Sequence, residues 1–340
     1  KNNLFIGTEG GGLNYVDRFT NKISTFVNKP GHTSSLSSNL VKKILIDKDK
    51  NVWIGTHGGG LNLFDSRRHT FRQVLTDLPF LSHRQSEIVS LHEDSENTFW
   101  LGAHSGLYAF KRSGTLLTPV YKKELEQMRA VNISALLEDD NKNIWIGSLA
   151  GLYFFNRKTG SIAPIPVKHH INNINCITED SRGNIWIGLS HGGLAMYDRK
   201  MNAVVPVTLN DDLSNKNILG ILEDTQNNLW ISTGNGLVKY NFLDESVRTY
   251  TKSDGLAGNE FNYNAFFKDK TGEMFFGGVN GLISLFPDKI RNNKFAAPVV
   301  FTGLEVLNKP INARDKSGIL QNDINYTDKV ELKHNQNTFT

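Results

Sequence analysis

The sequence predicts an all-β protein, and more closely a seven-bladed β-propeller of four-stranded antiparallel blades. The first observation is a repeated phrase of polar, apolar, aromatic, apolar and glycine residues, of which Asn184–Gly188 is a full copy. Successive copies stand 41 to 48 residues apart, and a period of about 40–45 residues is typical of propeller blades. The second observation is that all five tryptophans of the chain occupy the aromatic position. The seven copies have their aromatic residue at Phe5, Trp53, Trp100, Trp145, Trp186, Trp230 and Phe275.

One repeat shows why each copy predicts a blade. The first stretch, from Leu40, is rich in apolar residues, and Asp47–Asn51 is a turn, because Asp bonds backbone amides and Asn tolerates positive φ. The repeated phrase forms the next strand, a glycine-rich turn follows, and the residues after it alternate as in a half-buried strand. The four strands of this repeat are expected at 40–46, 52–56, 61–65 and 70–74.

The aromatic ring of each repeat is predicted to fill the wedge between neighbouring blades. Trp53 lies mid-strand in an apolar phrase, and one such ring buries about 150–250 Å². Gly55, two residues later, lets two backbones approach closely. A ladder of tryptophans that stacks on carbohydrate is the alternative, and the apolar setting favours packing.

Carboxylate pairs precede several copies of the phrase and resemble pairs used in acid–base catalysis. A catalytic pair converges once, whereas these pairs recur in one turn position around a ring. We therefore interpret them as turn-forming residues. The pairs are Glu93-Asp94, Glu138-Asp139, Glu179-Asp180 and Glu223-Asp224.

The composition excludes several classes of protein. The 340 residues carry a net charge of 38 − 34 = +4 without a basic run, so nucleic acid is not an expected partner. Apolar runs are too short to span a bilayer, and no secretory signal is visible. The single Cys176 excludes an internal disulfide framework and is expected in the core. Because the chain starts at Lys1 without a Met and stops inside a strand-like stretch, we expect it to be a fragment.

The repeat unit resembles the two-component regulator propeller repeat. The residues that carry the resemblance are Asp180–Gly188, Gly193-Leu194, Tyr197-Asp198, Glu260–Asn262 and Phe276–Leu282. Residues 298–304 and Asn308–Pro310 then resemble the start of the Ig-like domain that follows such propellers.

This resemblance implies the periplasmic sensor region of a Bacteroides-type hybrid two-component system (histidine kinase/response regulator), whose usual inputs are oligosaccharides released during polysaccharide utilisation. It implies a homodimer partner, and a second propeller, a membrane helix and a kinase elsewhere in the full-length chain. The sequence shows no kinase His-box and no receiver, so phosphotransfer is expected outside the fragment, which is itself expected not to be an enzyme.

These expectations divide the chain into three parts. Residues 1–286 form the propeller, 287–297 a linker, and 298–340 the truncated start of an Ig-like β-sandwich, a domain that needs about 100 residues. The first copy begins at its second strand, so the innermost strand of that blade lies upstream or comes from elsewhere in the ring.

A ligand is expected on the face shared by two sets of loops, which are those between second and third strands and those that join successive blades. Candidates on the first set are Glu9, His57, His104, His191, Asn235 and Asn280. Candidates on the second set are Arg84, Arg129, Lys168 and His170, which could meet acidic groups of a glycan. For any one of them, an ordinary solvated loop residue is the alternative.

Two other functions compete with that of a sensor. We expect no metal and no cofactor, because the histidines are spaced by blade and no carboxylate cluster accompanies them. A metal-dependent lyase that linearises cyclic antibiotics would nevertheless use His and Glu on this face, and Glu9, His57 and His104 would be the residues to suspect. A non-catalytic scaffold for protein partners is the other alternative.

Overall fold

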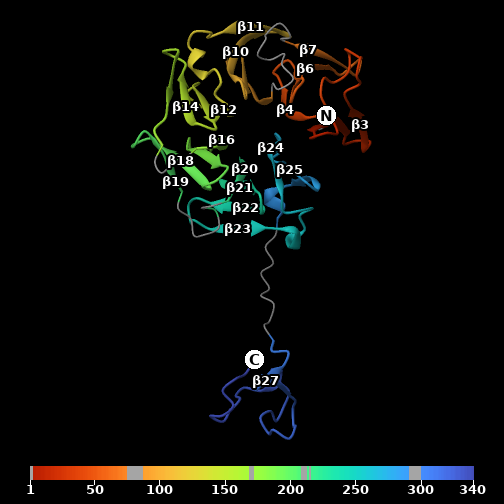
Figure 1. Ribbon diagram of the computed structural model, residues 1–340, viewed down its shortest axis with the longest axis vertical. Helices are drawn as coiled ribbons and strands as arrows, with labels where there is room; N and C mark the ends of the chain where they lie inside the picture. The colour runs from red at the N-terminus through yellow and green to blue at the C-terminus, as the bar shows by residue number, and fades with distance from the viewer. Residues whose placement is uncertain (1–2, 75–86, 168–171, 208–212, 214–215, 291–299) are drawn as a thin grey trace. The chain divides into compact units, whose positions relative to one another are not determined.

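The chain is a ring of antiparallel sheets followed by a small separate unit (Figure 1). The computed structural model describes residues 3–74, 87–167, 172–207, 213, 216–290 and 300–340. The two compact units are Lys1–Lys289 and Ile290–Thr340, and each is described by itself. The first unit holds seven successive sheets, so the predicted all-β, seven-bladed propeller is confirmed.

The blades follow one another in chain order. Blade 1 contains β1 (Leu4–Gly7), β2 (Leu13–Asp17) and β3 (Lys22–Phe26). Blade 2 contains β4 (Val41–Ile46), β5 (Val52–Thr56), β6 (Gly60–Asp65) and β7 (Thr70–Val74). Blade 3 contains β8 (Ile88–Glu93), β9 (Thr98–Ala103), β10 (Gly106–Ser113) and β11 (Leu116–Val120). Blade 4 contains β12 (Ile133–Glu138), β13 (Ile144–Ser148), β14 (Gly151–Asn156) and β15 (Ser161–Pro164). Blade 5 contains β16 (Ile174–Glu179), β17 (Ile185–Leu189), β18 (Leu194–Asp198) and β19 (Ala203–Pro206). Blade 6 contains β20 (Ile218–Glu223), β21 (Asn228–Thr233), β22 (Gly236–Asn241) and β23 (Val247–Tyr250). Blade 7 contains β24 (Phe261–Lys268), β25 (Met274–Gly278) and β26 (Gly281–Leu285).

Blades 2 to 6 have the four antiparallel strands that the repeat predicts. Blade 1 has three described strands and begins at the position of a second strand, as expected from its incomplete repeat. Blade 7 differs from the prediction, because its sheet also has three strands in the described residues. The chain leaves β26 into the short 3-10 helix η3 (Pro287–Lys289). Pro287 has no N–H to donate to a strand ladder, which accounts for the end of the sheet there.

The tryptophans fill the wedges between blades, as predicted. Trp53 is fully buried and its ring lies 5.0 Å from that of Phe99 in the next blade, measured between ring centroids. Trp100 lies in the same way 5.1 Å from Phe155. None of the five tryptophans is more than 2% exposed. Of the two phenylalanines in this position, Phe5 of blade 1 is half-buried, whereas Phe275 of blade 7 is 5% exposed.

The glycine of the phrase allows close packing, also as predicted. A Cβ atom at Gly55 would lie 2.7 Å from Cγ2 of Ile88, the residue that opens the inner strand of the next blade. The same approach recurs at Gly102, where a Cβ would lie 2.6 Å from Cγ2 of Ile133. Each of these isoleucines is followed by a register shift of the inner strand. The fixed glycine therefore sets the spacing between blades.

The turn carboxylates are structural, and the interpretation made from their recurrence is correct. Asp180 accepts a hydrogen bond from the Trp186 indole nitrogen at 2.9 Å and another from the Asn184 backbone nitrogen at 2.8 Å. The same Asp–Trp bond, at 2.8 to 3.0 Å, holds each of the five tryptophans. The preceding glutamates bond to the turn of the previous blade, as Glu223 does to the Ser181 backbone nitrogen at 2.8 Å. Each Glu-Asp pair thus links one blade to its neighbour.

An ion pair joins the last blade to the first. The two terminal guanidinium nitrogens of Arg18, which follows β2, donate to the carboxylate of Glu273, at 2.7 and 3.1 Å. The carboxylate is buried, and the guanidinium carbon also lies 5.7 Å from the centroid of the Phe275 ring. Since Phe275 occupies the tryptophan position of blade 7, Arg18 covers the wedge between blades 7 and 1.

The interior of the ring is crossed by a segment of β24. The register of blade 7 jumps between Phe261 and Phe266, and the intervening residues reach the inner strands of other blades. Tyr263 donates its hydroxyl to the Ser134 carbonyl of blade 4 at 2.7 Å. Asn264 accepts a bond from the Lys43 amine of blade 2 at 2.7 Å and donates to a carbonyl of blade 3. Blade 7 is therefore tied to blades 2, 3 and 4.

The second unit has a two-stranded antiparallel sheet, β27 (Leu304–Val306) and β28 (Lys309–Ile311), and a 3-10 turn, η4 (Ile324–Tyr326). Backbone bonds between Glu305 and Thr340, at 2.9 and 3.0 Å, place the end of the chain beside β27. The Ig-like assignment stays a prediction. Most of the expected linker, 287–297, lies outside the described residues.

Candidate functional site

The two sets of loops expected to carry a ligand site do share one face of the propeller. In blade 2 the backbone nitrogen of His57 donates to the carbonyl of Leu40 at 2.9 Å. In blade 3 the nitrogen of His104 donates to the carbonyl of Glu87 at 3.1 Å, and blades 4 to 7 repeat the bond. Each loop between second and third strands is thereby fixed to the loop that enters its own blade. We call this side the funnel face.

Five charged or titratable residues come together on the funnel face, and we call them the funnel cluster. Its centre is Glu87, whose carboxylate lies 3.0 Å from Nδ1 of His57 and 3.3 Å from Nδ1 of His104. Lys42 places its amine 3.2 Å from the same carboxylate and also pairs with Glu9. The cluster joins loops of blades 1, 2 and 3.

The centre of the cluster is charged and its histidines are open. The side chain of Glu87 is only 13% exposed, whereas those of His57 and His104 are 42% and 45% exposed. Burial opposes ionisation of Glu87, but the charges of His104 and Lys42 and the hydrogen bonds from Lys42 and His57 outweigh it, and the pKa of Glu87 falls below its usual value. A fixed carboxylate therefore orients two imidazoles whose outer edges face solvent.

The structure brings together three of the predicted site residues, Glu9, His57 and His104. Exposed His191, Asn235 and Asn280 lie on the equivalent loops of blades 5, 6 and 7, outside the funnel cluster. Arg129 pairs with Glu126 at 2.6 Å, and both side chains are more than half exposed. The remaining candidates, Arg84, Lys168 and His170, lie outside the described residues.

Sequence reasoning missed Lys42 and Glu87. No carboxylate cluster is expected beside the histidines, and the structure places one carboxylate, that of Glu87, between His57 and His104. One signal was available, since Lys42 and Lys43 are charged residues near the start of an inner strand whose other residues are apolar. In the described ranges, no group of three or more His, Cys, Asp or Glu side chains is arranged to hold a metal ion.

Comparison with known proteins identifies the repeat. Four segments match the family model described as two component regulator propeller, at residues 35–58, 127–150, 170–191 and 212–235. Four of the seven blades therefore contain a segment similar to the two-component regulator propeller repeat. Each segment contains the inner strand of a blade, its second strand and the start of the loop that follows. The match therefore includes funnel-face residues of blades 2, 4, 5 and 6.

The chain is similar to parts of a histidine kinase and of a hybrid two-component system, and to a lyase. The chain is 34% identical over 120 residues to Histidine kinase P4 of Formosa agariphila, a match that covers 35% of this chain and 9% of the kinase. It superposes with a TM-score of 0.76 and 22% identity on the extracellular domain of the hybrid two-component system BT3049 of B. thetaiotaomicron, covering 99% of this chain and 44% of that one. Virginiamycin B lyase of Staphylococcus aureus superposes with a TM-score of 0.55 and 12% identity, covering 78% and 88%. The two structural likenesses concern the fold alone.

The matches cover only part of these proteins, 44% of the B. thetaiotaomicron structure and 9% of the Formosa kinase. The described residues include no helix with the length and apolar character needed to cross a bilayer.

Proposed function

We propose that this propeller is the ligand-binding module of an extracytoplasmic, periplasmic sensor, and that its ligand is an oligosaccharide released from a glycan. The observation that supports the proposal most strongly is the funnel cluster, in which a shielded carboxylate positions the exposed imidazoles of His57 and His104. Imidazoles can donate and accept hydrogen bonds, which suits the hydroxyls of a sugar. The repeat type, found in sensors of two-component systems, supports the signalling role.

A response would be relayed by a kinase in another part of the protein. Ligand bound between the loops of blades 1, 2 and 3 would change how these loops pack, and coupling to a dimer partner or a neighbouring domain would carry the change onward. On this proposal the fragment itself catalyses no reaction.

The test is calorimetry of the 340-residue chain against a panel of glycan-derived oligosaccharides. For a saccharide that binds, His57→Ala and His104→Ala should each lower the affinity at least tenfold, about 1.4 kcal/mol. The exposed His334→Ala in the second unit is the matched control and should leave affinity unchanged.

Unaltered affinity in both funnel variants would remove the funnel cluster from the binding site. Lack of binding to every saccharide, with capture of a defined protein partner, would favour the scaffold. Turnover of a cyclic peptide that depends on a divalent metal would favour the lyase.

A further inference from the structure

The arginines at the ends of the third strands differ in whether a carboxylate neutralises them. The side chains of Arg112 in blade 3 and Arg157 in blade 4 are 4% and 9% exposed, and each guanidinium lies 2.7 to 3.1 Å from a carboxylate of the preceding blade. Arg199 of blade 5 occupies the same position of its repeat but is exposed. Its Nη2 donates to the Gly183 carbonyl at 2.6 Å, and it forms no ion pair with any acid among the described residues. The charge of Arg199 is therefore not neutralised as in the two preceding blades.

A lysine of the neighbouring blade also has no acidic partner. Lys158 lies in the turn between β14 and β15 of blade 4, and its side chain is exposed. Its backbone nitrogen donates to the side-chain oxygen of Asn156 at 3.0 Å. Its amine forms no hydrogen bond and no ion pair in the part of the chain that the structure describes. Two basic groups are thus available where blade 4 meets blade 5.

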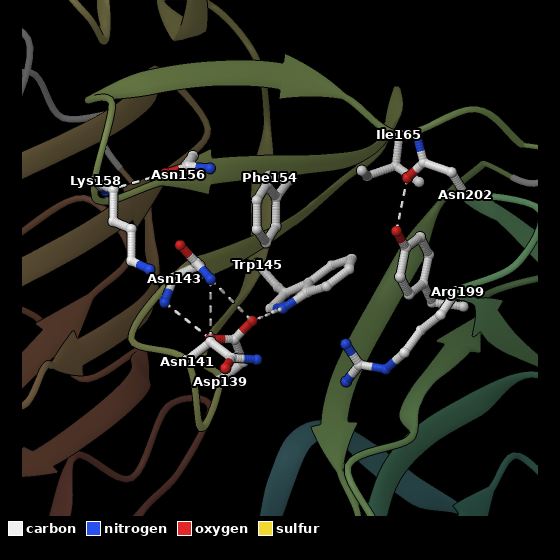
Figure 2. A pocket seen from close by; sticks show the side chains of 11 residues that line it. Asp139, Asn141, Asn143, Trp145, Phe154, Asn156, Lys158, Ile165, Arg199 and Asn202 are labelled. Carbon is white, nitrogen blue, oxygen red and sulfur yellow. Dashed lines mark hydrogen bonds between the residues drawn. The ribbon is translucent and has the colours of Figure 1, made fainter.

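These two basic side chains line one cleft, which has a volume of about 370 Å³ (Figure 2). The turn between β12 and β13, the end of β14 and the end of β18 supply most of its lining, so it opens on the side opposite the funnel face. In the view of Figure 2, Lys158 and Arg199 lie on opposite sides of the cleft with Asp139 between them. Volumes of about 300–1,000 Å³ are typical of ligand sites.

The charge of the lining favours an anion. Asp139 is the only acidic side chain among the described residues that line the cleft, and it is 5% exposed. Its Oδ2 accepts from the Trp145 indole nitrogen at 3.0 Å and its Oδ1 from the Asn143 backbone nitrogen at 2.9 Å. Asp139 thus holds the blade together, as its equivalents do. Two positive residues, Lys158 and Arg199, and one negative residue leave the lining with a net charge of +1.

Three asparagines add hydrogen-bond donors that the protein does not use. None of the side-chain nitrogens of Asn141, Asn156 and Asn202 donates a hydrogen bond within the described ranges. The side-chain oxygens of two of them are occupied, that of Asn156 by backbone nitrogens of its own turn and that of Asn202 by the Tyr197 hydroxyl at 2.6 Å. The cleft therefore offers N–H groups to a ligand that is rich in oxygen acceptors.

Aromatic rings provide an apolar surface beside these donors. Phe154 and Tyr197 are half-buried and stand edge-on to the buried Trp145, at 4.9 and 4.8 Å between ring centroids. The contact with the indole fixes both rings and leaves part of each open to the cleft. The face of an aromatic ring carries partial negative charge, so it attracts the C–H groups on the apolar face of a sugar ring.

We propose that the cleft between blades 4 and 5 binds a sugar acid, that is, a sugar residue that carries a carboxylate or a sulfate. Lys158 and Arg199 bind the anionic group through charge-assisted hydrogen bonds. The asparagine amides donate to the hydroxyl and ring oxygens, and Phe154 and Tyr197 pack against the C–H face. The site lies opposite the funnel cluster and is argued from its own lining, so it does not depend on the function proposed above.

The indole signals of the five tryptophans in a ¹H–¹⁵N spectrum of the 340-residue chain test this proposal, because Trp145 alone of them lines the cleft. Methyl β-glucuronide should shift the Trp145 signal saturably and bind at least tenfold more tightly than the neutral methyl β-glucoside. Glucose 6-sulfate makes the same comparison for a sulfate and shows which anionic group binds more tightly. Equal affinity for glucuronide and glucoside, equal affinity for glucuronide and acetate, or no shift with either anionic sugar would overturn the proposal.

Three variants locate the anionic group. Lys158→Met and Arg199→Met should each weaken glucuronide binding at least fivefold and reduce the preference over the glucoside. Lys200→Met is the matched control, because Lys200 is exposed in the same turn as Arg199 but does not line the cleft, and it should leave the affinity unchanged. All three side chains are exposed, so the variants should fold, which urea denaturation checks. Equal losses in Arg199→Met and Lys200→Met would contradict the proposed position.

His57→Ala separates this site from the funnel cluster. The glucuronide should shift Trp145 with the same affinity in His57→Ala as in wild type, whereas a saccharide bound by the funnel cluster should keep its affinity in Arg199→Met. Loss of the Trp145 shift in His57→Ala would overturn the proposed cleft site without deciding the function of the funnel cluster.

Discussion

Replacing one turn aspartate tests how the blades are held. Asp180 is 3% exposed and accepts four hydrogen bonds: from the Trp186 indole, from the backbone and amide nitrogens of Asn184, and from the Arg182 backbone nitrogen. In Asp180→Ala the Trp186 N–H stays buried without an acceptor, which costs about 1–3 kcal/mol. The other donors lie nearer to water and add about 0.5–1 kcal/mol each. We expect a total loss of about 3 kcal/mol in the free energy of unfolding, since water replaces part of these bonds.

Urea denaturation followed by tryptophan fluorescence measures this loss. Asp198→Ala is the matched control in the same blade, because Asp198 also accepts two backbone bonds, from Lys200 and Met201 at 2.8 and 3.1 Å, but in an exposed turn. It should cost less than about 1 kcal/mol, because water reaches both donors. Equal losses in the two variants would refute the reasoning that burial of the indole donor decides the energy.

The comparison of wild type with Asp180→Ala also predicts a pH dependence. Burial opposes ionisation of Asp180, but hydrogen bonds from Trp186 and Asn184 outweigh it, so its pKa falls below the usual value of 3.8. A carboxyl with a lowered pKa in the folded state stabilises the fold above its unfolded pKa and loses that contribution as pH falls through the folded pKa. The difference between wild type and Asp180→Ala should therefore be constant above about pH 5 and shrink below about pH 4. If the difference in the free energy of unfolding is unchanged at low pH, the carboxylate charge is not involved.

Two further predictions concern the interior and the closure of the ring. Burial lowers the pKa of Lys43 to about 8 from 10.5, so the unfolded chain binds more protons than the folded chain between these pH values. The free energy of unfolding of wild type relative to Lys43→Met should therefore rise by about 1.4 kcal/mol per pH unit from pH 8 to 10.5. A constant difference between the two proteins in urea denaturation across this range would contradict the prediction. Arg18→Ala removes the bond between blades 7 and 1, so hydrogen exchange should accelerate in β2 and β25 and stay unchanged in β13 and β17; uniform acceleration would show that the pair does not act locally.

The sequence predicts the structure that every blade repeats, but not the side-chain contacts between the loops and inner strands of different blades. Trp186, Gly188 and Asp180 recur at fixed spacing, and each acts through a neighbour in its own blade or at a regular junction. The site residues act across loops of unequal length. Glu87 meets His57 and His104 only because two loops are fixed to its own segment, and neither spacing nor residue type reveals that meeting. The crossing of Asn264 to Lys43 is hidden for the same reason, since 221 residues separate the two.

Because the blades repeat one structure, each position in the ring can be compared with the equivalent positions of the other blades. When one fold position is occupied five times by the same indole–carboxylate pair, packing alone explains it, and such positions carry no evidence for function. The informative positions are those that lack a hydrogen-bond partner which the equivalent positions of other blades possess. Glu179 lacks the donor that Glu93, Glu138 and Glu223 possess, although its blade keeps an arginine at the same chain position. A buried oxygen without a donor costs about 1–3 kcal/mol, so the regular packing of the blades does not by itself account for Glu179.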